Sequence, residues 1–114
     1  MNRIGLIRVL TTRDAGLLNA HGERIQGYFR EIEVVSRCIP GHPEGVHDEA
    51  TFRTAVPLVV NMAKEFEREG FNAVIVSCAD DPGVPEARRE LRIPVVGAGG
   101  SVAAMALSLG ERIG

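Results

Sequence analysis

Aromatic side chains are few in this chain of 114 residues, and basic charge is not in excess. The sequence has four phenylalanines and one tyrosine, and its 13 basic and 15 acidic residues give a net charge of -2 at pH 7. Proteins that bind nucleic acids need a basic surface to neutralise phosphates, and many use aromatic rings that stack on bases. Because the charges are interspersed and no basic stripe is present, we expect no nucleic-acid partner.

Long apolar runs are also missing. The longest run is far shorter than the roughly 20 residues that a membrane-spanning helix requires. The chain does not open with a charged and then apolar leader. We therefore expect a cytoplasmic protein that has no membrane partner. The length is that of one domain, which can bury roughly two thirds of its unfolded surface.

Only two cysteines are present, Cys38 and Cys78. In a reducing compartment such cysteines are typically free. If both end strands that are separated by a third strand, they lie roughly 10 Å apart. A disulfide requires Cα atoms about 4.4–6.8 Å apart, so the strand arrangement predicted below favours two free thiols.

Apolar runs and amphipathic segments alternate along the chain, which predicts alternating strands and helices. Short connections between them favour a parallel sheet with right-handed crossovers. We expect an α/β fold of the flavodoxin-like, three-layer type, with about four parallel strands in the order 2-1-3-4. The predicted strands are 4–10, 32–39, 73–77 and 93–96, and the predicted helices are 17–29, 48–70, 85–91 and 101–109.

The boundary signals of the second predicted helix, residues 48–70, are the clearest in the chain. Asp48 or Thr51 can cap the helix at its start, and Gly70 is a typical residue just after a helix end. Pro57 falls inside this span. Since an interior proline removes a backbone donor, we expect the helix either to kink at Pro57 or to start later than Asp48.

The segment Ala73–Gly83 (AVIVSCADDPG) carries the main functional signal. Its apolar run predicts a buried strand, and the residues that follow Cys78 end it in a turn. Open parallel sheets bind ligands beyond the carboxyl ends of their strands. A helix start that points its amides at the sulfur would favour the thiolate. The alternative is a buried cysteine that acts as a small hydrophobe.

A glycine-rich turn, residues 97–100, precedes the last helix. Its amides predict an anion site, although it could equally be a tight turn between strand and helix. Val102 occupies the third glycine position of a G-x-G-x-x-G pattern, so we expect no nucleotide cofactor. The hydroxyl groups of Thr11, Thr12 and Ser77 could add donors at the same edge, or the threonines could be ordinary loop residues.

Other polar residues allow two interpretations. Asp80 and Asp81 could orient a substrate amine or simply form the turn. Arg8 and Arg37 lie in predicted strands, so each should point to the ligand edge or pair with a carboxylate. The loop 40–47 holds His42 and His47, whose spacing matches no closed metal site, so we expect a solvated loop and no metal. We expect His21 to be exposed on the first helix.

Five segments of the sequence resemble the aspartate/glutamate/hydantoin racemase superfamily, and its hydantoin racemase branch in particular. The most specific are Ser77–Gly83 (SCADDPG) and Ile93–Ala104 (IPVVGAGGSVAA). The others are Ile4–Val9 (IGLIRV), Val34–Ile39 (VVSRCI) and Ala63–Gly70 (AKEFEREG). This resemblance implies two similar α/β domains with the active site between them, and one proton-transferring cysteine from each domain, without a cofactor.

By this resemblance, residues 1–114 form a single α/β domain equivalent to the first half of such a racemase. The end of the chain, Arg112-Ile113-Gly114, repeats Arg3-Ile4-Gly5 and looks like the start of a further strand. The second thiol would then come from a missing second half or from another copy in a homo-oligomer. Cys38 is an intrachain alternative, but thiols at one sheet edge would not face each other across a substrate.

The resemblance implies racemase or isomerase activity on a hydantoin or an amino-acid-like small molecule, with Cys78 as the catalytic thiol. The implied substrate-binding residues are Thr11, Ser77, Ala79, Asp80, Gly97, Gly99 and Gly100. Two alternatives remain open. The chain could be a non-catalytic half-domain that binds small anions or a partner. It could also be an isomerase or decarboxylase of the same superfamily that uses one cysteine.

Overall fold

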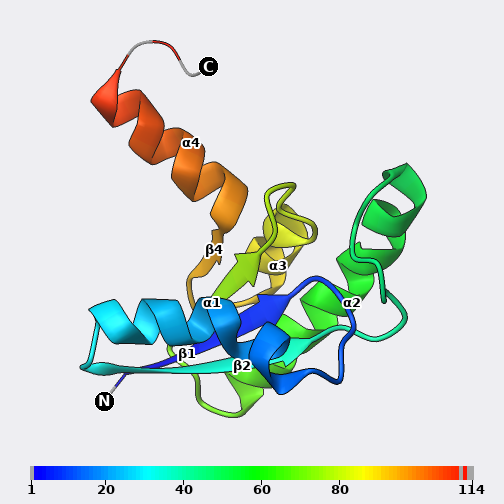
Figure 1. Ribbon diagram of the computed structural model, residues 1–114, viewed down its shortest axis with the longest axis horizontal. Helices are drawn as coiled ribbons and strands as arrows, with labels where there is room; N and C mark the ends of the chain where they lie inside the picture. Colours follow the sequence, from blue (N-terminus) through cyan, green and yellow to red (C-terminus); the bar gives the residue numbers. More distant parts are fainter. Residues whose placement is uncertain (1, 111, 113–114) are drawn as a thin grey trace.

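The computed structural model describes residues 2–110 and 112, and it shows four strands that alternate with four helices (Figure 1). The predicted start of a further strand at residues 112–114 lies largely outside the described residues. In chain order the elements are β1 (Asn2–Arg8), α1 (Ala15–Tyr28), β2 (Ile32–Cys38), α2 (Glu49–Arg68), β3 (Ala73–Ser77), α3 (Val84–Glu90), β4 (Val95–Gly97) and α4 (Ala98–Leu109).

The four strands form one parallel sheet in the order β2-β1-β3-β4, which confirms the predicted α/β fold and strand order. All carboxyl ends therefore meet at one edge. In the sheet register, Arg8 at the end of β1 is opposite Cys38 of β2 and Ser77 of β3. The residues that follow these strand ends are the ones that can share a site.

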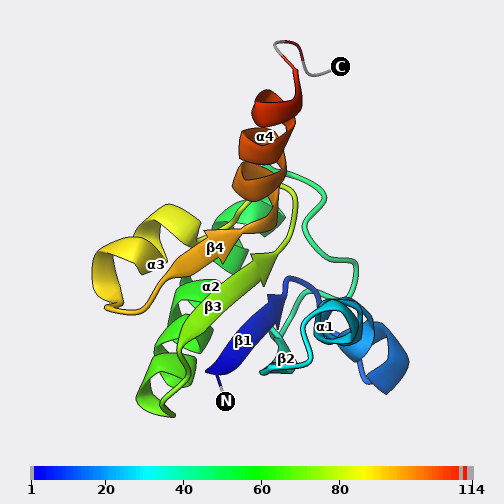
Figure 2. The same ribbon diagram turned by 90° about the vertical axis from the view of Figure 1, so that its left-hand side faces the viewer.

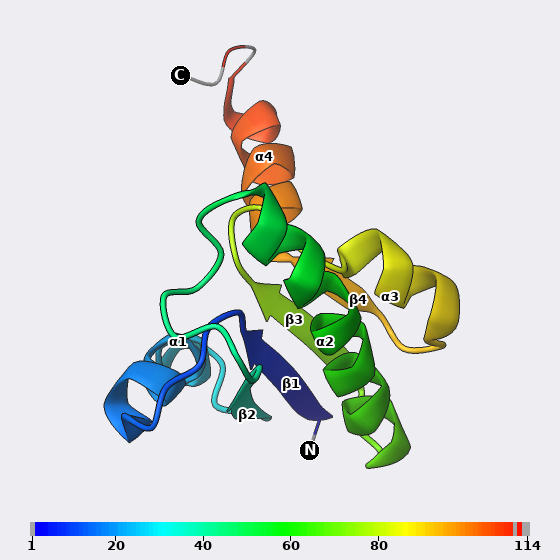
Figure 3. The same cartoon turned by 90° about the vertical axis from the view of Figure 1, so that its right-hand side faces the viewer.

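Helices cover the two faces of the sheet unequally. α1 lies on one face, beside β2, and α2 and α3 lie together on the other (Figures 2 and 3). The core is built between the sheet and α2, where Phe66 is fully buried. Gly5 allows this packing, because a Cβ atom there would lie 2.4 Å from the Phe66 ring.

The long helix α2 starts where the cap signals predict. The Asp48 carboxylate accepts the Thr51 N–H at 2.7 Å, and the Thr51 hydroxyl accepts the Asp48 N–H at 3.1 Å, which forms a capping box. Gly70 follows the helix with a φ of 86°, a conformation that glycine adopts without strain. The helix contains Pro57 and begins at Glu49, directly after its cap Asp48, so of the two alternatives given for Pro57, a later start was wrong.

The largest boundary difference concerns α4, which begins at Ala98 rather than at the predicted Ser101. The glycine-rich residues 98–100 form its first turn instead of a separate turn. Glycines are poor helix formers, and their sequence alone indicated a loop. The structure supplies a side chain that holds this turn, as described below.

Helix α4 stands away from the rest of the molecule (Figure 1). It contains no charged residue, yet Val102, Met105, Leu107 and Leu109 are 60–84% exposed. A helix that is apolar all round is normally buried, so α4 is an uncovered apolar surface. No helix in the described ranges is long and apolar enough to span a membrane.

Candidate active site

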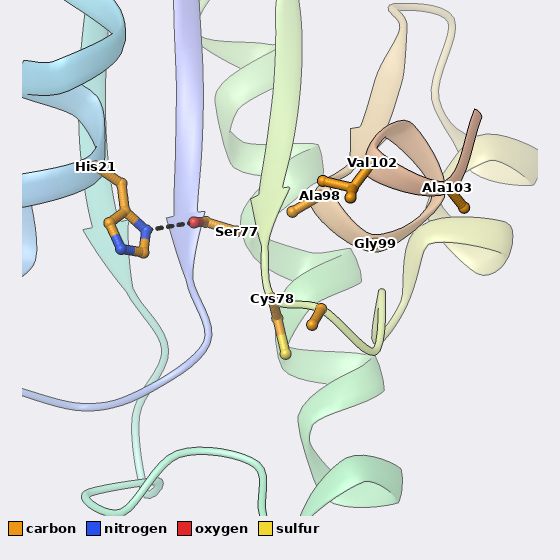
Figure 4. A pocket seen from close by; sticks show the side chains of 8 residues that line it. His21, Ser77, Cys78, Ala98, Gly99, Val102 and Ala103 are labelled. Atoms are coloured by element: carbon orange, nitrogen blue, oxygen red, sulfur yellow. Dashed lines mark hydrogen bonds between the residues drawn. The ribbon is translucent and has the colours of Figure 1, made fainter. Parts of the chain in front are cut away.

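Cys78 lies directly after β3, at the carboxyl edge of the sheet, where the sequence predicted it. It is half-buried and packs against the edge of the core. Beside it is a cavity of about 460 Å³ between α1, the end of β3 and the start of α4 (Figure 4). The residues that line this cavity are His21, Ser77, Cys78, Ala79, Ala98, Gly99, Val102 and Ala103.

The environment of Cys78 raises the pKa of its thiol, which favours the thiol over the thiolate. Burial is the main cause, and the charges of Asp80 and Asp81 add to it, while the Asp80 backbone N–H acts in the opposite direction. As this domain stands, Cys78 is a protonated thiol at neutral pH, which suits a proton donor better than a base.

The predicted glycine-rich anion site is already filled by a side chain of the protein. The Asp81 carboxylate accepts the N–H groups of Gly99 at 2.8 Å and Gly100 at 2.7 Å. A Cβ atom at Gly97 would lie 2.4 Å from this carboxylate, and one at Gly99 would lie 2.0 Å from the Ala79 carbonyl oxygen. These glycines therefore permit close backbone packing, and an external anion would have to displace Asp81.

Thr11 uses its hydroxyl group within the fold. It donates to the Ile39 carbonyl oxygen at 2.5 Å and accepts the His42 N–H at 2.8 Å. A hydroxyl group has a single hydrogen to donate, so Thr11 has none left for a substrate in this arrangement. The geometry thus gives Thr11 a structural role, joining the ends of β1 and β2 to the loop that follows, in place of the expected substrate contact.

The predicted site residues divide into two groups. Cys78, Ser77, Ala79 and Gly99 line one cavity, so the structure brings them together. Asp80 is exposed at the turn, and Thr11, Gly97 and Gly100 are not among the lining residues.

His21 was not among the site residues predicted from the sequence, where it was expected only to be exposed on the first helix. His21 is exposed, but its Nδ1 lies 2.6 Å from the Ser77 Oγ, and it lines the same cavity as Cys78. Burial, followed by the positive charges of Arg8 and Arg24, lowers the pKa of His21. The pairing joins residues 56 positions apart, and no local motif signals it.

Arg8 follows neither predicted alternative. It is buried, with 5% exposure, and donates to the carbonyl oxygens of Leu17 and Leu18 in α1, the latter at 3.5 Å. No carboxylate in the described ranges pairs with it. Arg37 does meet a carboxylate, through a bidentate pair with Glu69 at 2.6 and 2.8 Å.

The loop before α2 is not uniformly solvated as expected. His42 is buried, its Nδ1 lies 2.9 Å from the Pro40 carbonyl oxygen, and its Nε2 lies 2.9 Å from the Thr54 hydroxyl oxygen. His47 is exposed beside Asp48. Within residues 2–110 and 112, no three His, Cys, Asp or Glu side chains form a metal-binding group.

Both cysteines are free, as predicted. Cys38 ends β2, and β1 separates that strand from β3. Its Sγ lies 3.7 Å from the Thr12 carbonyl oxygen, and Cys38 does not line the cavity. Of the two thiols, only that of Cys78 is placed to meet a molecule in this cavity.

A solved structure supports the fold independently. Allantoin racemase from Klebsiella pneumoniae is similar to this chain with a TM-score of 0.77 and 21% sequence identity. The match covers 95% of this chain and 44% of that enzyme, so the chain spans less than half of the enzyme's length.

Sequence comparison identifies the family. No curated protein matches the sequence. The model of the Asp/Glu/Hydantoin racemase family, however, matches residues 9–114, which include all the cavity-lining residues. This chain therefore belongs to the Asp/Glu/hydantoin racemase family.

Proposed function

We propose that this chain is the catalytic domain of a racemase or isomerase that moves the α-proton of a hydantoin or amino-acid-like substrate through Cys78. The observation that carries the proposal is the position of the Cys78 thiol. It lies at the carboxyl edge of the sheet and lines a cavity, in a chain of a racemase family. The proposed step moves a proton between carbon and sulfur, so protein groups alone can perform it.

An α-proton beside a carbonyl group is weakly acidic, and the carbanion formed by its loss must be stabilised and then reprotonated. Cys78 as a thiolate would remove the proton, and as a thiol it would return one. Because the pKa of Cys78 is raised, proton removal by this domain should be slow at neutral pH and should accelerate as the pH rises.

Inversion of a stereocentre also needs a proton donor on the opposite face of the substrate. Cys38 does not line the cavity, so we propose that a second copy of the chain or the remainder of a longer protein supplies this group. On this view, residues 1–114 correspond to the first half of a two-domain racemase. The uncovered helix α4, which borders the cavity through Val102 and Ala103, is the surface that such a partner would cover.

The test is loss of the α-proton signal by ¹H NMR in D₂O. Each enantiomer of hydantoins, allantoin, aspartate and glutamate is incubated separately with the protein. We expect exchange that Cys78→Ala abolishes and that the matched variant Cys38→Ala leaves unchanged. Exchange of both enantiomers would indicate a complete two-base site, and exchange of one alone a working half-site.

Exchange that persists in Cys78→Ala would contradict the proposal. A well-folded chain without exchange on any substrate would favour the non-catalytic half-domain instead.

A single thiol in the cavity also fits a second candidate, an isomerase or decarboxylase that uses one cysteine as nucleophile or proton donor. Incubation with maleate distinguishes the two. A covalent adduct at Cys78, detected by mass spectrometry and absent in Cys78→Ala, would favour this candidate over α-proton transfer.

A further inference from the structure

The side chains of His21 and Ser77 meet at the wall of the cavity that contains Cys78. His21 comes from α1 and Ser77 is the last residue of β3, so the pair joins two separate elements (Figure 4). The His21 Nδ1 and the Ser77 Oγ lie 2.6 Å apart, within hydrogen-bond distance. Ser77 and Cys78 are adjacent in the chain, so a ligand that reaches the thiol also reaches this pair.

The positive charge of Arg8 lies close to His21 and Ser77, and no carboxylate of the described residues neutralises it. Arg8 is opposite Ser77 in the sheet register, and its guanidinium group reaches the carbonyl oxygen of Leu17, one helical turn before His21. The Arg8 Nε is buried and has no hydrogen-bond partner among the described residues. A buried cation is normally paired with an anion, and here no carboxylate of the described chain takes that place.

This charge adds to burial in lowering the pKa of His21. Burial, Arg8 and Arg24 all lower its pKa, so the imidazole is neutral at neutral pH and carries one proton. If that proton is on Nδ1, it is donated to the Ser77 oxygen, and the hydroxyl hydrogen of Ser77 is free for a ligand. If it is on Nε2, the Ser77 hydroxyl donates to Nδ1 and offers the cavity only lone pairs.

The two arrangements suit opposite kinds of ligand. The free hydroxyl hydrogen suits a hydrogen-bond acceptor, and the lone pairs suit a hydrogen-bond donor. A negatively charged oxygen needs a hydrogen-bond donor, and the positive charges of Arg8 and Arg24 attract it. The charges of Asp80 and Asp81 act on Cys78, whereas the charges that act on His21 are those of Arg8 and Arg24. Asp80 is exposed at the turn beyond Cys78.

We propose that His21 and Ser77 form an anion-binding corner of the cavity. In it, the Nδ1–H of His21 holds the Ser77 oxygen and turns the Ser77 hydroxyl hydrogen toward a carboxylate or enolate oxygen of the substrate. His21 is a positioning residue, and Ser77 makes the contact. The identity of the substrate rests on the proposed function, but the binding of a negatively charged oxygen at this corner does not.

The direct test follows the His21 imidazole by ¹H–¹⁵N NMR in the 114-residue chain during titration with aspartate, hydantoin or acetate. Binding should raise the fraction of the Nδ1–H tautomer. It should also raise the pKa of His21, because an anion nearby stabilises the imidazolium. In Ser77→Ala both responses should be lost. The exposed His47, which lies outside the cavity, serves as an internal control and should not respond.

Variants of His21 separate positioning from simple space filling. His21→Asn can keep an N–H group near the position of Nδ1, whereas His21→Leu fills the space without a donor. We expect Ser77→Ala and His21→Leu to weaken aspartate binding about 10-fold or more, the usual effect of losing a hydrogen bond to a charged group. His21→Asn should recover most of that loss.

The corner and the proposed function can fail separately. Unchanged His21 signals with all three probes, or equal binding by Ser77→Ala and the unmodified chain, would overturn the anion-binding corner even if α-proton exchange occurs. A His21 response that Ser77→Ala removes would support the corner. That result would hold even if no α-proton exchange were detected and the proposed function were rejected.

Discussion

Cys78 shows how the surroundings of one residue decide the chemistry it can perform. Its position at the end of a buried strand is the usual place of a reactive group in a parallel sheet. Cys78 is nevertheless half-buried, and its surroundings are acidic because Asp80 and Asp81 follow closely in the chain. The thiol is therefore held in its protonated form, and whatever activates it as a base must bring positive charge or hydrogen-bond donors.

This leads to a prediction for Asp80→Asn, which removes a nearby negative charge but keeps the backbone N–H. The variant should lower the pKa of Cys78, so alkylation by iodoacetamide at pH 7.5 should become faster. The measurement is the alkylation rate against pH, with Cys38→Ala as the background so that a single thiol reacts. An unchanged or slower rate would mean that the charge of Asp80 does not contribute to the raised pKa of Cys78.

At the scale of the element, the start of α4 depends on Asp81. This residue has a φ of 51°, a left-handed conformation that is uncommon outside glycine but tolerated by Asp and Asn. The conformation places its carboxylate on the amides of Gly99 and Gly100. The side chain of Asp81, in the turn after β3, thus caps a helix that begins 17 residues later in the chain.

We expect Asp81→Ala to destabilise the first turn of α4 by about 1–2 kcal/mol, the usual cost of losing a helix cap. Asp81→Asn should cost less, since an amide oxygen can still accept one N–H group. Amide hydrogen exchange of residues 98–109 is the appropriate measurement, because α4 makes few contacts with the body. Asp80→Ala is the control, and equal loss of protection in it would contradict a specific cap.

The predictions for individual elements succeeded where local signals are strong. The sequence predicted both the Asp48 cap and the end of α2 at Gly70, since each of these residues acts within a few positions of the helix end. The start of α4 was placed three residues too late, because three glycines within four residues indicate a turn unless a distant carboxylate is known to hold them. For the same reason the sequence did not show that His42 is buried or that the Thr11 hydroxyl is used within the fold, since each has a partner in another segment.

For the whole molecule, the exposed apolar surface of α4 is the feature that most needs a partner. The helix is apolar on every side and largely uncovered. Exposure of such a surface favours association. A second copy of the chain presents the same apolar helix, so two copies can cover each other's exposed side chains.

We therefore expect the chain to dimerise through α4, and Met105→Glu to shift it to monomers by burying a charge in the interface. Sedimentation velocity at increasing protein concentration measures this. The control is Tyr28→Glu, which alters an exposed residue of α1 and should leave the association unchanged. A chain that is monomeric at about 100 µM would argue against self-association, since stable interfaces hold at lower concentration.

The sequence by itself determined the α/β fold, the strand order and the place of Cys78 at the carboxyl edge. Periodicity, caps and short connections act over a few residues, and a parallel sheet then allows few topologies. Tertiary structure alone decided the contacts that tune the site: His21 with Ser77, Asp81 with α4, and Arg8 with carbonyl oxygens of α1 instead of a carboxylate of residues 2–110 and 112. These pairings join residues that are distant in the chain, and their energies depend on burial and orientation, which only the folded chain defines.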